Sequence, residues 1–142
     1  MQLANYMYQM VRCELMDAVG AEFVNSGAAD ALGHSIDYYW IPEMWHDRGR
    51  EPQRPDFVVH PGSAGEVAKV MKIANQYGIP VTPWGGGSGS QGGALPVYGG
   101  IVLDMKRMNR VVEIDTRTLS VTCETGINAQ HLEWAVEKAG YS

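Results

Sequence analysis

The sequence predicts an α+β fold in which helices flank a mixed sheet. Residues 57–82 contain a strand, a helix and a second strand, and the right-handed crossover rule makes these two strands parallel. Residues 119–124 alternate apolar and polar side chains, which is typical of a half-buried strand in an antiparallel hairpin. Parallel and antiparallel strands together predict the mixed sheet, and helical periodicity around it predicts the flanking helices.

The chain begins with a predicted amphipathic helix over residues 3–19, which ends before Gly20. After it we predict a turn at residues 25–27 and one helical turn at residues 28–32. Residues 46–55 combine charges, a glycine and two prolines, so we expect an exposed connector there. The apolar residues of the first helix recur at three- and four-residue spacings, and they are Leu3, Tyr6, Met7, Met10 and Val11.

A clearly patterned region starts with the predicted strand at residues 57–59. Ser63 and Glu66 form a capping-box signature that opens the next helix. Gly78 stands where a left-handed C-terminal cap is expected, so it ends this helix. The second strand of the unit is then predicted at residues 79–82.

Two further strands are predicted at residues 101–105 and 111–115, and residues 119–124 pair with the second of them. A last helix is capped by Asn128 and ends at Gly140. A strand–helix unit normally returns to its sheet, whereas this sequence stops two residues after Gly140. We therefore expect an incomplete domain and interpret the chain as a fragment.

Composition and charge argue against several classes of function. The 142 residues carry a formal net charge of −5 with only 11 Lys plus Arg, which disfavours nucleic-acid binding. No run of about 18 apolar residues suggests a membrane span, and the N-terminus lacks the pattern of a signal peptide. We therefore expect a cytoplasmic protein. Cys13 and Cys123 are isolated, which predicts reduced thiols, and the four histidines lack metal-ligand spacing, so no metal site is predicted.

A glycine-rich stretch at residues 85–100 differs in composition from the rest of the chain. Residues 87–92 match the G-x-G-x-x-G fingerprint of dinucleotide-binding folds, but that fingerprint must open a helix. Here more glycines and a proline follow, and a strand begins at Ile101. A Walker-type phosphate loop is also rejected, because no Gly-Lys-Ser/Thr closes the motif.

The same stretch nevertheless favours an anion. Gly85, Gly86 and Gly87 lack Cβ atoms, so their amides can turn inward together and donate to phosphate oxygens. Ser88 and Ser90 add hydroxyl donors. Such a loop can hold the diphosphate of a nucleotide cofactor on an acidic protein without using lysine. The alternative interpretation is a flexible linker or a wide loop between strands.

Residues 54–141 resemble the FAD-binding domain of the vanillyl-alcohol oxidase and p-cresol methylhydroxylase superfamily, particularly its D-lactate dehydrogenase and glycolate oxidase D-subunit branch. The resemblance rests on the pyrophosphate loop, which reads WGGGSGSQGG at residues 84–93 where the family usually has Arg-Gly-x-Gly-Thr-Ser-x-x-Gly-Gly. It also rests on Asp-Met at 104–105, Met-Asn at 108–109 and the Glu-x-Gly turn at 124–126.

The resemblance implies a domain organisation and a cofactor. Residues 54–142 would form the first half of a PCMH-type FAD-binding domain, preceded by a helical or irregular extension and connector over residues 1–53. The second half and the substrate domain would lie outside this chain. The loop would wrap the FAD diphosphate mainly through backbone amides, and the turn near Gly126 would lie towards the adenosine. The implied cofactor-binding residues are Trp84, Gly85, Gly86, Gly87, Ser88, Gly89, Ser90, Gly92, Gly93 and Gly126.

Three departures from the family pattern refine this expectation. Trp84 replaces the commoner arginine, which removes a guanidinium contact. Gly89 replaces a hydroxyl residue, which removes a side-chain donor. Ser88 stands where covalent members of related branches carry the histidine that bonds the flavin. The resemblance therefore implies non-covalent FAD.

The implied activity is that of an FAD-dependent oxidoreductase. The favoured reaction transfers a hydride from a 2-hydroxy acid, such as D-lactate or glycolate, to N5 of the flavin. Oxidation of a 4-alkylphenol or aryl alcohol is the second interpretation, and a non-catalytic FAD- or nucleotide-binding module is the third. No catalytic residue is assigned. The expected partners are a small-molecule substrate and the remainder of the polypeptide or a second subunit, and a homo-oligomer is left open.

The other conspicuous side chains receive structural interpretations. His60 is expected to end its strand, with an approach to the flavin as the less favoured alternative. The aromatic residues at positions 38–40 and Trp45 are expected to pack against the domain rather than to line a substrate entrance. Cys123 is expected in the core and His131 on an exposed helix face.

Overall fold

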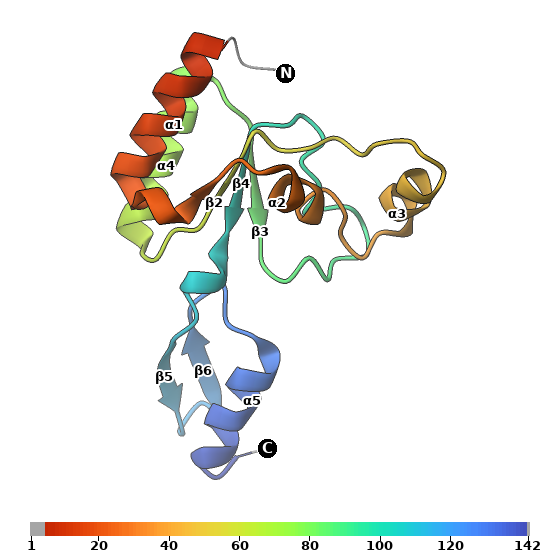
Figure 1. Ribbon diagram of the computed structural model, residues 1–142. Helices are drawn as coiled ribbons and strands as arrows, with labels where there is room; N and C mark the ends of the chain where they lie inside the picture. Colours follow the sequence, from red (N-terminus) through yellow and green to blue (C-terminus); the bar gives the residue numbers. More distant parts are fainter. Residues whose placement is uncertain (1–4, 142) are drawn as a thin grey trace.

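The computed structural model describes residues 5–141, so Leu3 lies outside the described part (Figure 1). The predicted α+β class, with a mixed sheet and flanking helices, is confirmed. In chain order the elements are α1 (Asn5–Val19), η1 (Ala21–Phe23), β1 (Val24–Asn25), α2 (Ala28–Gly33), α3 (Trp40–Asp47), β2 (Phe57–Val59), α4 (Ala64–Tyr77), β3 (Val81–Trp84), β4 (Ile101–Asp104), η2 (Met105–Arg107), β5 (Val111–Asp115), β6 (Ser120–Cys123) and α5 (Ala129–Lys138).

A four-stranded mixed sheet organises the N-terminal part of the protein. Its strand order is β1-β2-β4-β3, in which β1 is antiparallel to β2 and the other three strands run parallel. The predicted parallel orientation of β2 and β3 is confirmed, and β4 lies between them. The carboxyl ends of three neighbouring strands consequently meet at one edge of the sheet.

The sheet separates two apolar clusters, because successive strand residues point to opposite faces. On one face Phe57 and Ile101 belong to a buried core shared with α1 and α4, which lie together in Figure 1. On the other face Val58 and Val102 cluster with Trp84. Helix α1 and strand β1 thus belong to the same layered body as the later strands, and a domain boundary at residue 53 stays a prediction.

Local signals set the ends of α4 as predicted. The Ser63 hydroxyl oxygen accepts a hydrogen bond from the Glu66 N–H at 3.2 Å. The Glu66 carboxylate reaches back to the Gly62 N–H at 2.8 Å, one residue earlier than an ideal capping box. Gly78 has φ 63°, the left-handed conformation expected of the C-terminal cap.

Helix α3 is the main local difference from the sequence prediction, which places no helix at residues 40–47. Pro42 lies in its first turn, where a missing N–H removes no helical hydrogen bond. The Arg50 guanidinium carbon lies 4.3 Å from the centre of the Trp45 ring, which ties the connector to this helix. The connector is also less exposed than predicted, because Pro52 and Pro55 are buried.

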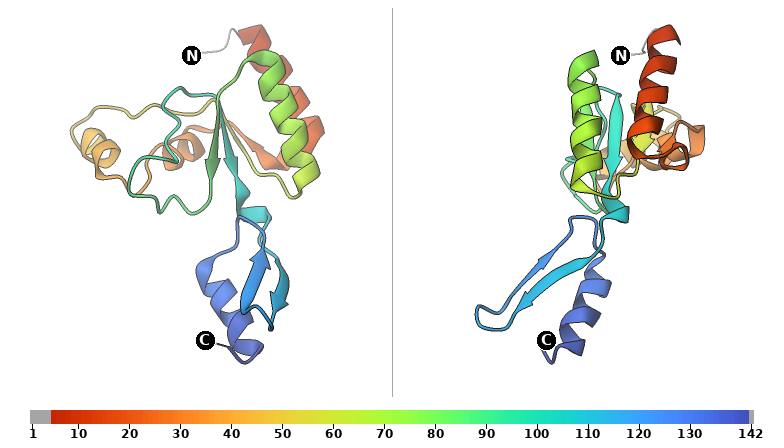
Figure 2. Two further views of the ribbon diagram at one scale, coloured as in Figure 1. Left: turned by 180° about the vertical axis from the view of Figure 1, so that it is seen from behind. Right: turned by 90° about the vertical axis from the view of Figure 1, so that its left-hand side faces the viewer.

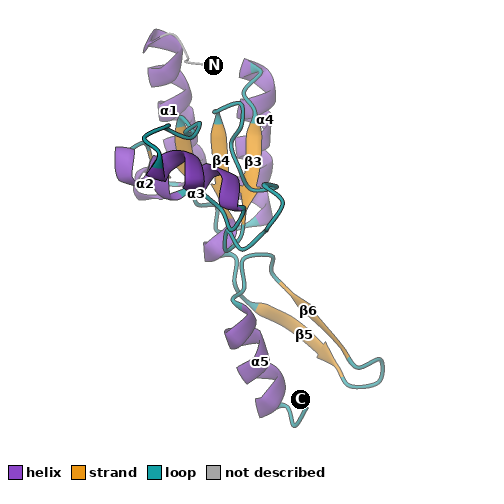
Figure 3. Ribbon diagram, turned by 90° about the vertical axis from the view of Figure 1, so that its right-hand side faces the viewer, coloured by secondary structure: helices purple, strands orange, loops and turns teal. Residues whose placement is uncertain are grey.

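A second unit consists of the antiparallel pair β5–β6 with α5 beside it, which confirms the predicted hairpin and final helix (Figure 2). The Asn128 side chain accepts from the Gln130 N–H at 2.8 Å, as expected of the N-cap. The unit lies beyond the carboxyl ends of the parallel strands (Figure 3). Within residues 111–141 no side chain is fully buried, so the prediction that Cys123 is a core residue is wrong, whereas His131 is exposed as predicted.

Among residues 5–141, no helix combines the length and apolar character needed to cross a membrane.

Candidate functional site

Three parallel strands bring a row of side chains to the carboxyl edge of the sheet. Trp84 at the end of β3 pairs in register with Asp104 at the end of β4. His60 comes one position after the pair Val59–Leu103, which places it beside Asp104 on the same face. Open sheets of parallel strands bind ligands outside this edge. The row therefore marks the first place to look for a site.

Asp104 is the buried centre of a charged cluster. Its Oδ2 accepts from His34 Nε2 at 3.1 Å and from Lys106 Nζ at 2.9 Å, and its Oδ1 accepts from the Lys106 N–H at 3.0 Å. His60 Nδ1 lies 3.5 Å from the same Oδ2. Burial acts to raise the pKa of Asp104, but the hydrogen bonds from His34 and Lys106 outweigh burial and lower the pKa to about 2.

The contacts of His34 favour its protonated form. Its Nε2 faces the Asp104 carboxylate and its Nδ1 lies 2.8 Å from the carbonyl oxygen of Asp30. Both partners accept hydrogen bonds, so both contacts are hydrogen bonds only when both ring nitrogens carry a proton. Burial acts to lower the pKa of His34, but the bonds to Asp104 and Asp30 raise it above 6.5. The pKa of His60 is lowered instead, chiefly by burial, which favours the neutral form of that ring.

We expect Asp104 to make stability sensitive to acid. Because its pKa falls from 3.8 to about 2 on folding, its contribution is complete above the unfolded value and is lost as the pH drops through about 2. The shift corresponds to about 2 kcal/mol. Urea unfolding between about pH 5 and about pH 2 should show this loss, and Asp104→Asn should remove it. The exposed Asp47→Asn control should keep the wild-type acid dependence, and an unchanged dependence in Asp104→Asn would contradict the prediction.

The glycine loop, residues 85–93, begins directly after Trp84 at this edge. Within the described residues, no backbone N–H of residues 86–93 donates a hydrogen bond. A Cβ atom added at Gly85, Gly86, Gly89 or Gly93 would meet no atom within 4 Å, so this loop borders open space. Unused donors beside open space are what an anion-binding loop provides.

Residues 38 and 39 hold the glycine loop from one side. The Tyr38 N–H donates to the Gly87 carbonyl oxygen at 2.9 Å. A Cβ at Gly92 would approach the Tyr39 ring to 3.2 Å. The aromatic residues at positions 38–40 and Trp45 are predicted to pack against the domain. This prediction is wrong for Tyr38, which is 80% exposed, and for Trp40, which is 62% exposed.

Asp37 places an unused acceptor in the same segment. The residue is only 7% exposed, and its Oδ1 accepts from the Tyr39 N–H at 3.0 Å. Its Oδ2 is buried without a hydrogen-bond partner among the described residues. A buried unpaired carboxylate oxygen is costly, and a hydroxyl group brought by a ligand would satisfy it. Free N–H donors and this acceptor together fit a cofactor that carries both a diphosphate and sugar-like hydroxyl groups.

Gly126 has a packing role that the sequence does not reveal. A Cβ at this position would overlap the Met105 carbonyl oxygen. The Gly126 N–H donates to the Met108 carbonyl oxygen at 2.8 Å, which joins the start of the second unit to η2. A contact between Gly126 and a cofactor stays a prediction.

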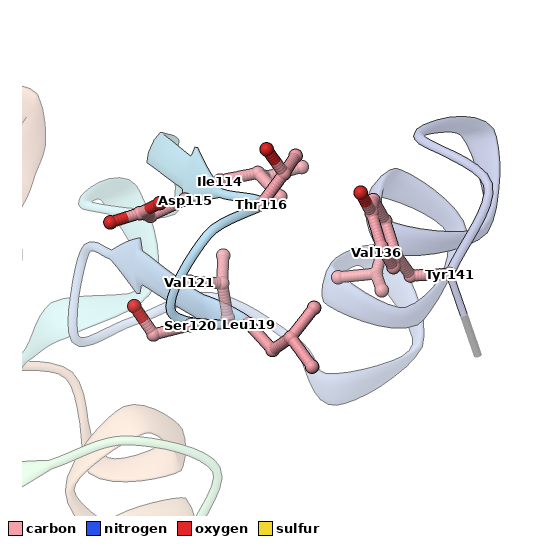
Figure 4. A pocket seen from close by; sticks show the side chains of 8 residues that line it. All are labelled: Ile114, Asp115, Thr116, Leu119, Ser120, Val121, Val136 and Tyr141. Carbon is pink, nitrogen blue, oxygen red and sulfur yellow. The ribbon is translucent and has the colours of Figure 1, made fainter.

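A pocket of about 200 Å³ lies on the second unit, between the hairpin and α5 (Figure 4). It is mainly apolar and brings together no set of catalytic side chains, so it is a packing surface rather than a candidate reaction site. Its lining residues are Ile114, Asp115, Thr116, Leu119, Ser120, Val121, Val136 and Tyr141.

The sequence predicts the glycine loop but misses the side chains that support it. Register along β4 could have placed Asp104 beside Trp84, since both end neighbouring strands. No comparable signal links His34 to Asp104, which are 70 positions apart in the chain. Asp37 was missed because its only sign is a buried atom without a partner.

Comparison with known proteins supplies the wider context. Residues 55–142 match the sequence pattern of a family described as FAD binding domain. The glycolate oxidase subunit GlcD of Bacillus subtilis is 35% identical over 130 residues, which cover 92% of this chain and 26% of that protein. A solved alkyldihydroxyacetonephosphate synthase superposes with a TM-score of 0.85 at 26% identity, over 94% of this chain and 25% of the other. The 4-ethylphenol oxidase from Gulosibacter chungangensis gives 0.80 at 26% identity, over 97% and 26%. The chain therefore spans about a quarter of the length of these relatives.

Proposed function

Because the chain belongs to the FAD binding domain family, we propose that its glycine loop holds the diphosphate of FAD in an FAD-linked oxidoreductase. The observation that carries this proposal is the run of N–H groups at residues 86–93, which are unused within the described residues and border open space. Trp84, the loop glycines, Ser88 and Ser90 form this part of the proposed site, and Gly126 is proposed on the adenosine side.

When bound, FAD supplies the hydride acceptor, and the residues of this chain position it. The loop amides and serine hydroxyls donate to the diphosphate, and Tyr38 and Tyr39 hold the loop in place. Asp37 Oδ2, which is buried without a hydrogen-bond partner among the described residues, would accept from a hydroxyl group of the cofactor, and this would remove its burial penalty. We propose that the FAD is held without a covalent bond from this chain. Ser88 occupies the loop position at which covalent members of related branches carry the histidine that bonds the flavin. No proton-transfer step is assigned to residues 5–141.

The proposed substrate is a 2-hydroxy acid, such as D-lactate or glycolate, oxidised by hydride transfer to the flavin. The similarity to a glycolate oxidase subunit over most of this chain supports it. A 4-alkylphenol or aryl alcohol is the second candidate, supported by the similarity to a 4-ethylphenol oxidase. A cytoplasmic location stays a prediction.

We further propose that the remainder of the polypeptide, or a second subunit, covers the second unit. Leu119 is 75% exposed and Trp134 is 52% exposed, so this small unit leaves large apolar side chains uncovered. The pocket between the hairpin and α5 continues that surface. Closing it would place further protein next to the carboxyl edge of the sheet, where we propose that FAD binds.

The visible absorption spectrum of the full-length protein, as its cell produces it, tests this function. We expect the two-band spectrum of a flavin, release of the flavin on acid precipitation, and anaerobic bleaching by D-lactate or glycolate. Bleaching by 4-alkylphenols alone would favour the second candidate. A flavin spectrum that no such substrate bleaches would favour a non-catalytic module. A colourless protein that also fails to bind added FAD would contradict the cofactor proposal.

A further inference from the structure

We propose that His34 is a positioning residue of the FAD site, whose protonated ring holds Trp84 beneath the glycine loop and adds positive charge under the diphosphate. The inference rests on the proposed function and extends the site to a residue outside the region that matches the family, residues 55–142. It is carried by three observations: the contacts of His34, the way Trp84 meets the loop, and the charge of the cluster.

His34 is fixed to three elements at the carboxyl edge. Its Nδ1 donates to the Asp30 carbonyl oxygen of α2 at 2.8 Å, and its Nε2 donates to Asp104 of β4 at 3.1 Å. Its ring centre lies 4.9 Å from that of Trp84 in β3. Because both hydrogen bonds need a donor nitrogen, only the protonated ring makes both of them. Protonation and the position of the ring are therefore linked.

Trp84 connects His34 to the glycine loop, because its ring contacts both His34 and Gly87. Trp84 is 5% exposed and packs with Val58 and Val102, so its ring has little freedom. Gly87 lies directly over the Trp84 ring, and a Cβ there would overlap it. Tyr38, four residues after His34, donates to the Gly87 carbonyl oxygen at 2.9 Å. The segment of residues 34–38 therefore contacts both Trp84, which precedes the loop, and Gly87 within the loop.

The cluster also carries a net positive charge at the edge where the loop begins. When His34 is protonated, His34 and Lys106 are cations and Asp104 is an anion, which leaves one positive charge on these three residues. His60 is neutral, with Nδ1 directed at Asp104 and Nε2 3.5 Å from Asn25 Nδ2. A partly buried charge is weakly screened, so it acts on a nearby diphosphate more strongly than a charge in water does.

The remaining charged groups around the cluster do not change its dependence on the protonation of His34. Asp30 offers His34 its backbone carbonyl oxygen. Arg107, next to Lys106, lies 3.4 Å from the Glu66 carboxylate. Asp37 adds a second carboxylate in the same segment of chain, so these four groups together carry no net charge when His34 is protonated and one negative charge when it is neutral. FAD should therefore bind more tightly when His34 is protonated.

Because FAD is expected to bind more tightly to the protein with protonated His34, the affinity for FAD should depend on pH. His34 is protonated below its pKa, which the fold raises above 6.5. As the pH rises through that pKa the ring loses its charge and one of its two hydrogen bonds, so the affinity for FAD falls and then levels off. We expect a loss of about tenfold between the protonated and neutral forms.

The experiment titrates full-length apoprotein with FAD, by quenching of flavin fluorescence, from about pH 6 to about pH 9. We expect the Kd of the wild-type protein to rise about tenfold. His34→Gln should bind about tenfold more weakly at the acid end and show no pH step. His131→Gln, on the exposed face of α5, is the matched control and should keep the wild-type curve.

A merely structural role would lower the melting temperature of His34→Gln and leave the pH step in place. A His34→Gln protein with the wild-type Kd and pH step overturns the inference, while FAD binding by the wild type still supports the proposed function. If His34→Gln does not fold, the wild-type protein decides, because a Kd that stays flat over this pH range also overturns the inference. Wild-type protein that binds no FAD at any pH contradicts the proposed function and the inference with it.

Discussion

A Gly86→Leu variant should lose its FAD and keep its fold. A Cβ on Gly86 would meet no atom within 4 Å, and the residue is not in the left-handed region, so the protein itself accommodates the new side chain. The leucine would occupy the space in front of the loop amides, where we propose that the diphosphate lies. We expect the affinity for FAD to fall by at least about a hundredfold. Flavin content and an FAD titration measure the loss, and thermal unfolding verifies the fold.

The neighbouring Gly87 offers a less clean test of the same idea. Gly87 has φ 67°, and any Cβ there would overlap the Trp84 ring, so Gly87→Leu would disturb the loop even without a cofactor. The matched control is Gly65→Leu on α4, where the nearest atom to a Cβ is the Ser63 hydroxyl oxygen at 3.8 Å. Gly86→Leu protein that purifies with as much flavin as Gly65→Leu would refute the assignment of the loop to the diphosphate.

Elements whose ends are set by local chemistry could be predicted from the sequence. Ser63 and Gly78 bound α4 because a side-chain cap and a left-handed glycine act within a few residues. Asn128 begins α5 for the same reason. The hairpin β5–β6 follows from alternation alone, since side-chain period and register are coupled in a strand.

Elements that depend on distant contacts could not be predicted. Strand β1 is only Val24–Asn25 and exists because it pairs with β2 far along the chain. Helix α3 lacks a side-chain cap, so no local signal marks its start at Trp40. Propensity and periodicity describe a segment by itself and do not report what it packs against.

The candidate site divides in the same way. The glycine loop stands out by composition, because binding through backbone amides requires residues without side chains close to the ligand. The groups around it, His34, Asp37 and Asp104, come from three separate segments that the sheet and the turns after α2 bring together. Composition therefore finds the part of the site built from backbone, and only the fold finds the part built from side chains.

Among the stability effects expected here, Gly126→Ala should give the largest. The new Cβ would overlap the Met105 carbonyl oxygen and lie 2.9 Å from the Lys106 backbone nitrogen. Neither segment can move freely, because the Gly126 N–H donates to the Met108 carbonyl oxygen at 2.8 Å and the Met108 N–H donates to the Met105 carbonyl oxygen at 2.9 Å. Relieving the overlap breaks this crossing, and we expect a loss of about 3 kcal/mol or more in the free energy of unfolding.

Urea unfolding of the full-length protein measures this loss, with Gly65→Ala as the control because Gly65 lies on α4 outside the glycine loop and the nearest atom to its Cβ would be the Ser63 hydroxyl oxygen at 3.8 Å. The same pair of variants separates packing from cofactor binding at Gly126. If Gly126→Ala is as stable as Gly65→Ala but binds FAD more weakly than Gly65→Ala does, then the packing explanation fails and the proposed contact with the adenosine gains support. If it is unstable and its folded fraction binds FAD with the wild-type Kd, then Gly126 serves the crossing of two chain segments and does not contact the cofactor.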